Sequence, residues 1–161
     1  MAHVTIEYMI FVPVLILQIF LFPIAASAMM NSWADSRMTL QLKEISGDLG
    51  SSMQQLYYTM DHDSIASGTV NSSLTVPATI QDGNNIYSYK IVLTNATTPH
   101  NSIQVMNLTL SLVGSKGTAS SIITLGNDAS WQNNANYSSI LITHITATKS
   151  GGTISLSFGG S

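Results

Sequence analysis

The short stretch MDHDS is where side chains that could bind a metal come closest together in this chain. Asp61, His62 and Asp63 are consecutive, and two carboxylates one residue apart can ligate calcium. No acidic loop of the twelve-residue kind follows them, and the other histidines are scattered without a paired spacing. The pattern favours a solvated end of a helix, and we expect no metal site here.

Catalytic chemistry has no recognisable arrangement in the sequence. The motifs of serine hydrolases, phosphate-binding loops and dinucleotide-binding domains are missing. The chain has no cysteine, which excludes a disulfide scaffold, a thiolate metal site and cysteine catalysis. The net charge of −3 provides no basic surface that would attract nucleic acid. We therefore expect no enzyme, no cofactor and no nucleic-acid partner.

Composition divides the chain into three zones. Charged residues make up 8% of the whole, compared with about 25% in an ordinary soluble domain. Residues 8–30 are almost wholly apolar, and residues 31–60 mix apolar with charged side chains. From residue 64 onward Ser, Thr, Asn and Gly dominate. The zones indicate a membrane-grade segment, an amphipathic continuation and a polar head rich in strands.

The apolar zone is long enough to cross a bilayer. Its 23 residues (8–30) would form a helix that spans a hydrocarbon core of about 30 Å. Gln18 is its strongly polar interior residue. Pro13 and Pro23 would kink or locally unwind the helix, and neighbours in a membrane or bundle can satisfy the carbonyls that they free.

Two simpler interpretations of this zone stay open. A secretory signal peptide would explain the small residues Ala26 and Ala28, but no Lys or Arg precedes the apolar run. A plain membrane anchor would explain the length, and Trp33 after the run is then an interfacial residue. In a bundle of helices, Trp33 would instead pack between the helices and the head.

The apolar pattern continues beyond the membrane-grade zone, which a plain anchor does not require. A stripe at spacings of three and four residues predicts a helix that buries one face, and Gly47 and Gly50 weaken this helix without ending it. We expect one helix over residues 1–60, ~85 Å long at 1.5 Å per residue. The stripe consists of Leu42, Ile45, Leu49, Met53, Leu56 and Met60.

The remaining residues, 64–161, predict an antiparallel β-sandwich, so the fold class is α+β. Met106, Leu108, Leu110 and Leu112 alternate with polar residues, as do Ile154, Leu156 and Phe158, and each set is expected to face a core. Turn signals separate the segments, and Trp131 falls in an exposed loop where packing is favoured over a glycan contact. The strand-like segments are 69–80, 85–95, 102–114, 120–126, 137–149 and 153–159.

Four N-x-S/T sequons lie in the head, at Asn71, Asn95, Asn107 and Asn136. Chance alone can produce sequons in a segment so rich in Asn, Ser and Thr. Asn107 alternates with core positions, so it is predicted to face outward. We expect N-linked glycans on at least two of the four, which would hydrate a surface that carries few charges.

Glu7 sits at the edge of the apolar run, and two explanations for it stay open. It can lie among lipid headgroups as an interfacial residue. Alternatively, it can pair with a positive group, because a carboxylate in an apolar bundle is costly without a partner. The α-amino group of a neighbouring chain is such a partner if the mature chain begins just upstream.

The segment HVTIEYMIFVPVLILQIFLFPIAASAMM resembles the type IV filament superfamily, which contains type IV pilins, archaeal pilins and archaellins. Glu7 matches the glutamate at the fifth position of those mature chains if this chain begins at His3, and Pro23 roughly matches their conserved proline. The resemblance covers residues 3 to about 60, and the head agrees in architecture only. The sequons, and the lack of a C-terminal cysteine pair, favour an archaeal pilin.

The resemblance implies a structural subunit of an extracellular helical filament, a homo-oligomer used for surface adhesion. It also implies membrane storage before assembly, a prepilin peptidase, an assembly ATPase and a platform protein. Glu7, Pro13, Gln18 and Pro23 would then serve assembly. The alternatives are a monomeric membrane-anchored surface glycoprotein, an archaellin and a minor pilin.

Overall fold

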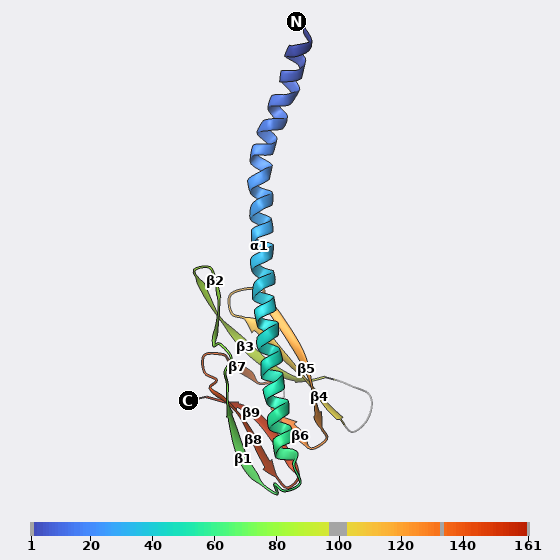
Figure 1. Ribbon diagram of the computed structural model, residues 1–161, viewed down its shortest axis with the longest axis vertical. Coiled ribbons are helices and arrows are strands. Elements are labelled where there is room, and N and C mark those ends of the chain that lie inside the picture. Colours follow the sequence, from blue (N-terminus) through green and yellow to red (C-terminus); the bar gives the residue numbers. More distant parts are fainter. Residues whose placement is uncertain (1, 97–102, 133, 161) are drawn as a thin grey trace. The chain divides into compact units, whose positions relative to one another are not determined.

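A computed structural model of the chain describes residues 2–96, 103–132 and 134–160, with side chains from residue 9 onward. The chain divides into two compact units, Met1–Ser36 and Arg37–Ser161. Its elements are α1 (Ala2–Asp61), β1 (Gly68–Ser73), β2 (Thr79–Asp82), β3 (Asn85–Asn95), β4 (Ile103–Leu112), β5 (Thr118–Gly126), β6 (Ala129–Trp131), β7 (Asn136–Ser138), β8 (His144–Ser150) and β9 (Thr153–Gly159) (Figure 1).

The described part of the first unit, residues 2–36, belongs entirely to α1 and is helical as the composition predicts. The helix assignment continues through Pro13 and Pro23. Proline has no N–H to donate, so Pro13 leaves the carbonyl of Met9 without its usual helical partner, and Pro23 does the same for Ile19. The unit therefore keeps its helical conformation despite two freed carbonyl groups.

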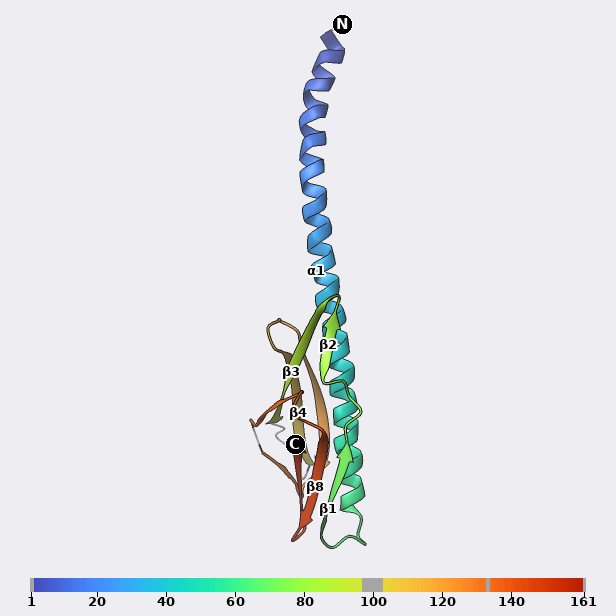
Figure 2. The ribbon, with the colours of Figure 1, turned by 90° about the vertical axis from the view of Figure 1, so that its left-hand side faces the viewer.

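The second unit, which we call the head, holds two sheets. One has the strand order β1-β8-β9-β6, and Figure 2 shows β1 beside β8. The other has the order β2-β3-β4-β5, with β7 added beside β3. Neighbouring strands are antiparallel except β6 and β9, which run parallel. The predicted α+β class with a sandwich-like head is therefore confirmed, with one parallel pair that the prediction did not contain.

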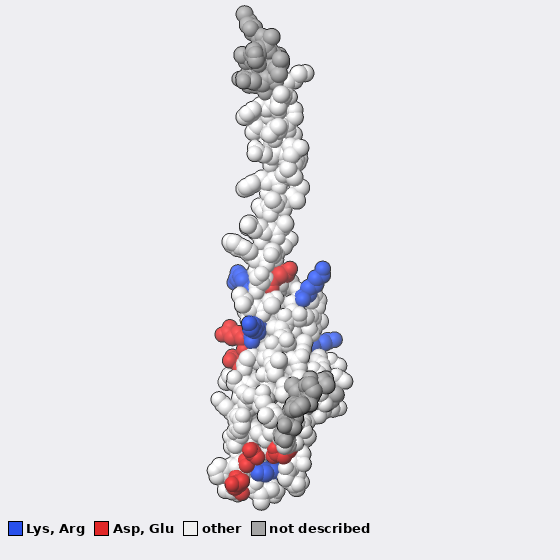
Figure 3. All heavy atoms as spheres, turned by 90° about the vertical axis from the view of Figure 1, so that its right-hand side faces the viewer, with Lys and Arg blue, Asp and Glu red and all other residues white. Residues whose placement is uncertain are grey.

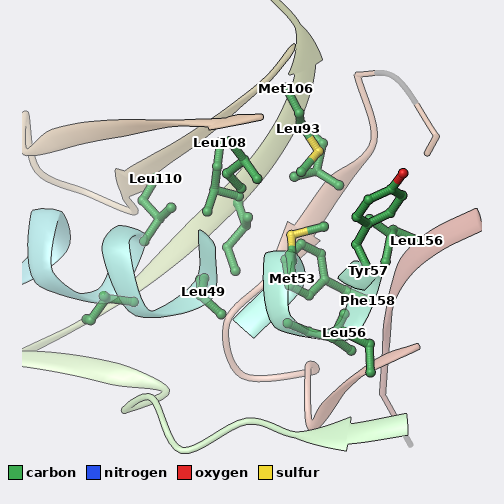
Figure 4. Packing of buried hydrophobic residues seen from close by; sticks show 14 of the residues in the cluster. Leu49, Met53, Leu56, Tyr57, Leu93, Met106, Leu108, Leu110, Leu156 and Phe158 are labelled. Atoms are coloured by element: carbon green, nitrogen blue, oxygen red, sulfur yellow. The ribbon is translucent and has the colours of Figure 1, made fainter. Parts of the chain in front are cut away.

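The second half of α1 supplies one wall of the head core. The predicted stripe from Leu42 to Met60 is buried, and Tyr57 joins it. Figure 4 shows Leu49 and Met53 directed toward strand residues such as Leu108. The predicted inward residues of β4 and β9 are also buried, which confirms the alternation.

Close approach of α1 to β5 depends on small residues. The Ser46 hydroxyl donates to the Ser121 hydroxyl at 2.7 Å, and Ser121 in turn donates to the Ser46 carbonyl at 3.0 Å. A Cβ at Gly50 would lie 3.2 Å from Cγ1 of Ile123. The glycine therefore allows a helix–strand contact that a larger residue would crowd.

Two predicted strands are each broken in the structure. Segment 69–80 divides into β1 and β2, and segment 137–149 divides into β7 and β8. In the second break, the Leu141 amide donates to the Ser138 carbonyl at 3.0 Å and closes a turn. The buried Ser139 is held there because its hydroxyl donates to the Ala78 carbonyl at 2.6 Å.

Candidate functional site

The main candidate site is the side-chain surface of α1 over residues 9–34, which we call the apolar helix surface. Its most apolar 18-residue stretch is 0% buried, and the helix is long and apolar enough to cross a membrane. Figure 3 shows this surface without charged atoms on the visible face. Its large exposed side chains are Met9, Ile10, Phe11, Val12, Val14, Leu15, Ile16, Leu17, Ile19, Phe20, Leu21, Phe22, Ile24, Met29, Met30 and Trp33.

The predicted assembly residues lie along this surface where the structure describes them. Gln18 and Pro23 line a shallow hollow of about 440 Å³ together with Leu15, Ile19 and Phe22. Pro13 is exposed on α1, before the residues that line this hollow. Glu7 belongs to α1, but its side chain lies outside the described residues, so its pairing stays a prediction.

Three of the four sequon asparagines are exposed. Asn71 lies on β1, Asn95 ends β3, and Asn136 begins β7. β1 is an edge strand, and among the described strands β7 pairs with β3 alone. These exposed asparagines therefore lie at strand ends or sheet edges.

Asn107 differs from the other three because β4 has a neighbour on each side. It faces away from the core as predicted, but it is half-buried between Thr94 on β3 and Ile122 on β5. Its Oδ1 is shielded from solvent and has no hydrogen-bond partner among the described residues. Outward alternation alone could not reveal this, because the sequence does not specify which strand is central.

In the MDHDS stretch, Met60 and Asp61 end α1, and the next three residues form the turn that follows. Nδ1 of His62 lies 2.8 Å from the Ser64 hydroxyl, and no group of three or more metal-binding side chains occurs within the described ranges. Lys149 of β8 donates to the carbonyl of Met60 at 2.9 Å. Sequence inspection missed this role of Lys149, which satisfies a carbonyl that the helix end leaves open.

Tyr57 and Asp128 form a polar contact at the edge of the head core. The Tyr57 hydroxyl donates to Oδ1 of Asp128, and the Tyr57 side chain is only 2% exposed. Burial, followed by the hydrogen bond and the charge of Asp128, raises the pKa of Tyr57 well above its ordinary value. The pair thus favours the protonated phenol and holds α1 to the connection between β5 and β6.

The segment around Trp131 is a strand rather than the predicted exposed loop. It forms β6, which pairs with β9, and Trp131 packs partly buried against the core. Its Nε1 is shielded and has no partner among the described residues. The favoured packing interpretation of Trp131 is therefore confirmed, while the loop is wrong because three residues form a short parallel pairing that composition does not indicate.

Comparison of the chain with protein-family models, with curated proteins and with solved structures found no match.

Proposed function

We propose that this chain is a structural subunit of an extracellular helical filament, of the type IV pilus kind, that serves surface adhesion. The observation that carries the proposal is the contrast along α1. Most side chains over residues 9–34 are apolar and exposed, whereas the stripe from Leu42 to Met60 is already buried in the head. One helix therefore needs a partner for its first half only.

Copies of the same helix are the partner that fits this surface. Sixteen or so large apolar side chains cannot stay in water, since burial of each is worth about 1.5–3 kcal/mol. A bundle would also bring donors, such as the amide of Gln18, near the carbonyls that Pro13 and Pro23 free. Contacts between unlike faces of neighbouring copies build an open helical fibre when the rotation from one copy to the next does not close a ring, and the proposal requires this open geometry.

Glu7 would set the axial register of such a bundle. Its carboxylate would pair with the α-amino group of a neighbouring copy, and this pairing would remove the cost of a charge in an apolar surrounding. Storage in the membrane would precede assembly, and the resemblance supplies the machinery: a prepilin peptidase, an assembly ATPase and a platform protein. Adhesion is the preferred use of such a filament, and motility by rotation is the alternative.

The alternative is a monomeric membrane-anchored surface glycoprotein. It is favoured by the same exposed helix, because lipid covers an apolar surface as well as protein does. The two functions differ in what contacts residues 9–34 in the mature state. A filament surrounds them with helices from other copies, and an anchor surrounds them with lipid.

Electron microscopy of material sheared from the cell surface, with mass spectrometry of its subunit, tests the proposal. Filaments that contain this chain support it, and recovery of the chain only as a membrane-bound monomer contradicts it. Glu7→Gln should reduce the filament yield, whereas Glu44→Gln, at an exposed position of the head helix, should not. Equal yields would overturn the role of Glu7 and leave the filament itself in place.

A further inference from the structure

A groove of about 310 Å³ opens on the head beside β7 and the end of β9. Its lining is mainly apolar and includes Tyr137, Leu141, Ile142 and Phe158. The rings of Tyr137 and Phe158 meet edge to face, with centroids 5.1 Å apart. Because Phe158 belongs to the core and is only 7% exposed, the floor of the groove is fixed by the packing of the head.

The turn beside the groove leaves apolar side chains in solvent. Ile140 is 61% exposed and Leu141 is 64% exposed, whereas many other isoleucines and leucines of the head are buried in its core. The turn is held in place on one side by the hydrogen bond between the Leu141 amide and the Ser138 carbonyl. On the other side Gly160 approaches so closely that a Cβ there would collide with the Leu141 carbonyl. These apolar residues therefore cannot simply turn inward.

The sequon Asn136-Tyr137-Ser138 lies at the same place. All three residues line the groove, and Asn136 is exposed at the start of β7. The other sequons lack this combination, because none of Asn71, Asn95 and Asn107 lines this groove. Sugars present C–H faces that pack on aromatic rings, and their hydroxyls keep the outer side of the contact hydrated.

We propose that Asn136 carries an N-linked glycan whose innermost sugar lies in the groove, against Tyr137 and Leu141, and covers this apolar surface. The glycosyl donor is a lipid-linked oligosaccharide phosphate. The bond between the anomeric carbon and the phosphate oxygen breaks, the bond between that carbon and Nδ2 of Asn136 forms, and Nδ2 loses one proton. The inference concerns the head alone, so it holds for a filament subunit and for an anchored glycoprotein.

The test uses the full-length chain, made in a host that N-glycosylates and solubilised in detergent, with site occupancy measured by mass spectrometry. Ser138→Ala removes the glycan while it keeps Asn136, and Ser138→Thr keeps the sequon. Ser73→Ala is the matched control, because it removes the sequon of Asn71, which lies on the edge strand β1. Asn136→Gln gives a second variant without the glycan that leaves Ser138 intact.

We expect Ser138→Ala and Asn136→Gln to lower the thermal midpoint by about 3–5 °C, as a loss of roughly one apolar contact would do in a head of this size. Ser138→Thr and Ser73→Ala should melt like the unchanged chain. An endoglycosidase should release the Asn136 glycan several-fold more slowly from the folded protein than from the unfolded protein. An unoccupied Asn136 overturns the proposal, and so does an occupied site with equal melting and equal release.

Discussion

At the residue scale, the bond from the Tyr57 hydroxyl to Asp128 is the contact whose loss we expect to cost most for a single atom removed. Tyr57→Phe should lower the free energy of unfolding by about 1.5–3 kcal/mol at neutral pH, because a hydrogen bond to a charged group is lost. Denaturant unfolding measures the change. Tyr58→Phe is the control, since Tyr58 is 62% exposed and should change stability by less than about 0.5 kcal/mol. If Tyr57→Phe and Tyr58→Phe changed the free energy of unfolding equally, the bond from Tyr57 to Asp128 would not stabilise the head as we expect.

The raised pKa of buried Tyr89 predicts that the head loses stability as the pH rises into the alkaline range. Tyr89 is 1% exposed, its hydroxyl donates to the Pro77 carbonyl at 2.7 Å, and burial raises its pKa from 10.0 to about 12. The unfolded chain releases this proton first, so stability is fully present below pH 10 and is lost as the pH rises toward 12. The loss is about 1.4 kcal/mol per pH unit for each such tyrosine.

Unfolding free energies between pH 8 and about 12 measure this slope. Tyr89→Phe has no proton to release at this position, so its stability should fall less steeply above pH 10 than that of the unchanged chain. Its stability at neutral pH will be lower, because the bond to Pro77 is lost. If the stability of the two proteins fell in parallel with pH, the pKa of Tyr89 would be the same in the folded and the unfolded state, and the prediction would be wrong.

At the scale of elements, two glycines of α1 give a matched pair. Gly47→Ala should stabilise the head by about 0.5–1 kcal/mol, because a Cβ there meets nothing within 4 Å and alanine favours the helix. Gly50→Ala should gain less or destabilise, because the Cβ would lie 3.2 Å from buried Ile123. Thermal unfolding of both variants tests this. An equal or larger gain at Gly50 would mean that α1 does not pack tightly on β5.

The elements themselves were predictable where one face of a helix or strand is buried. The spacing from Leu42 to Met60 identified the buried face of α1, and the alternation in β4 identified its inward residues. Segment 137–149 was not predictable, because Ile140 and Leu141 look like strand residues but lie exposed in a turn. What fixes that turn is Ser139, whose hydrogen bonds with Ala78 and Tyr89 exist only in the folded head.

The candidate sites divide in the same way. The apolar helix surface could be predicted from composition, because residues 8–30 are almost wholly apolar and a helix made of them is apolar on every side. The surroundings of each sequon do not follow from the sequence, because Asn107 and Asn136 both match the same N-x-S/T pattern. The first lies half-buried on the central strand β4, and the second lies beside a groove that forms only when β7 and β9 come together.

At the scale of the whole molecule, the division into two units predicts that the head folds without the apolar helix surface. Every buried apolar residue among those described lies at position 38 or later. Removal of residues 1–34 would leave Asp35 and Ser36 at the new helix start, and both residue types cap helices well. The shortened chain should therefore dissolve in water as a monomer and unfold cooperatively, whereas the full chain should require detergent, lipid or other copies of itself.

Sedimentation in detergent-free buffer, together with thermal unfolding followed by circular dichroism, measures both properties. A full-length variant with Phe20→Lys is a useful control, because it adds a charge to the apolar helix surface and leaves that surface otherwise intact. It should still associate or bind detergent, since one lysine offsets only about 3 kcal/mol of a much larger apolar segment. A shortened chain that aggregates or melts without cooperativity would show that the head core depends on residues before Asp35, and the two units would then not be independent.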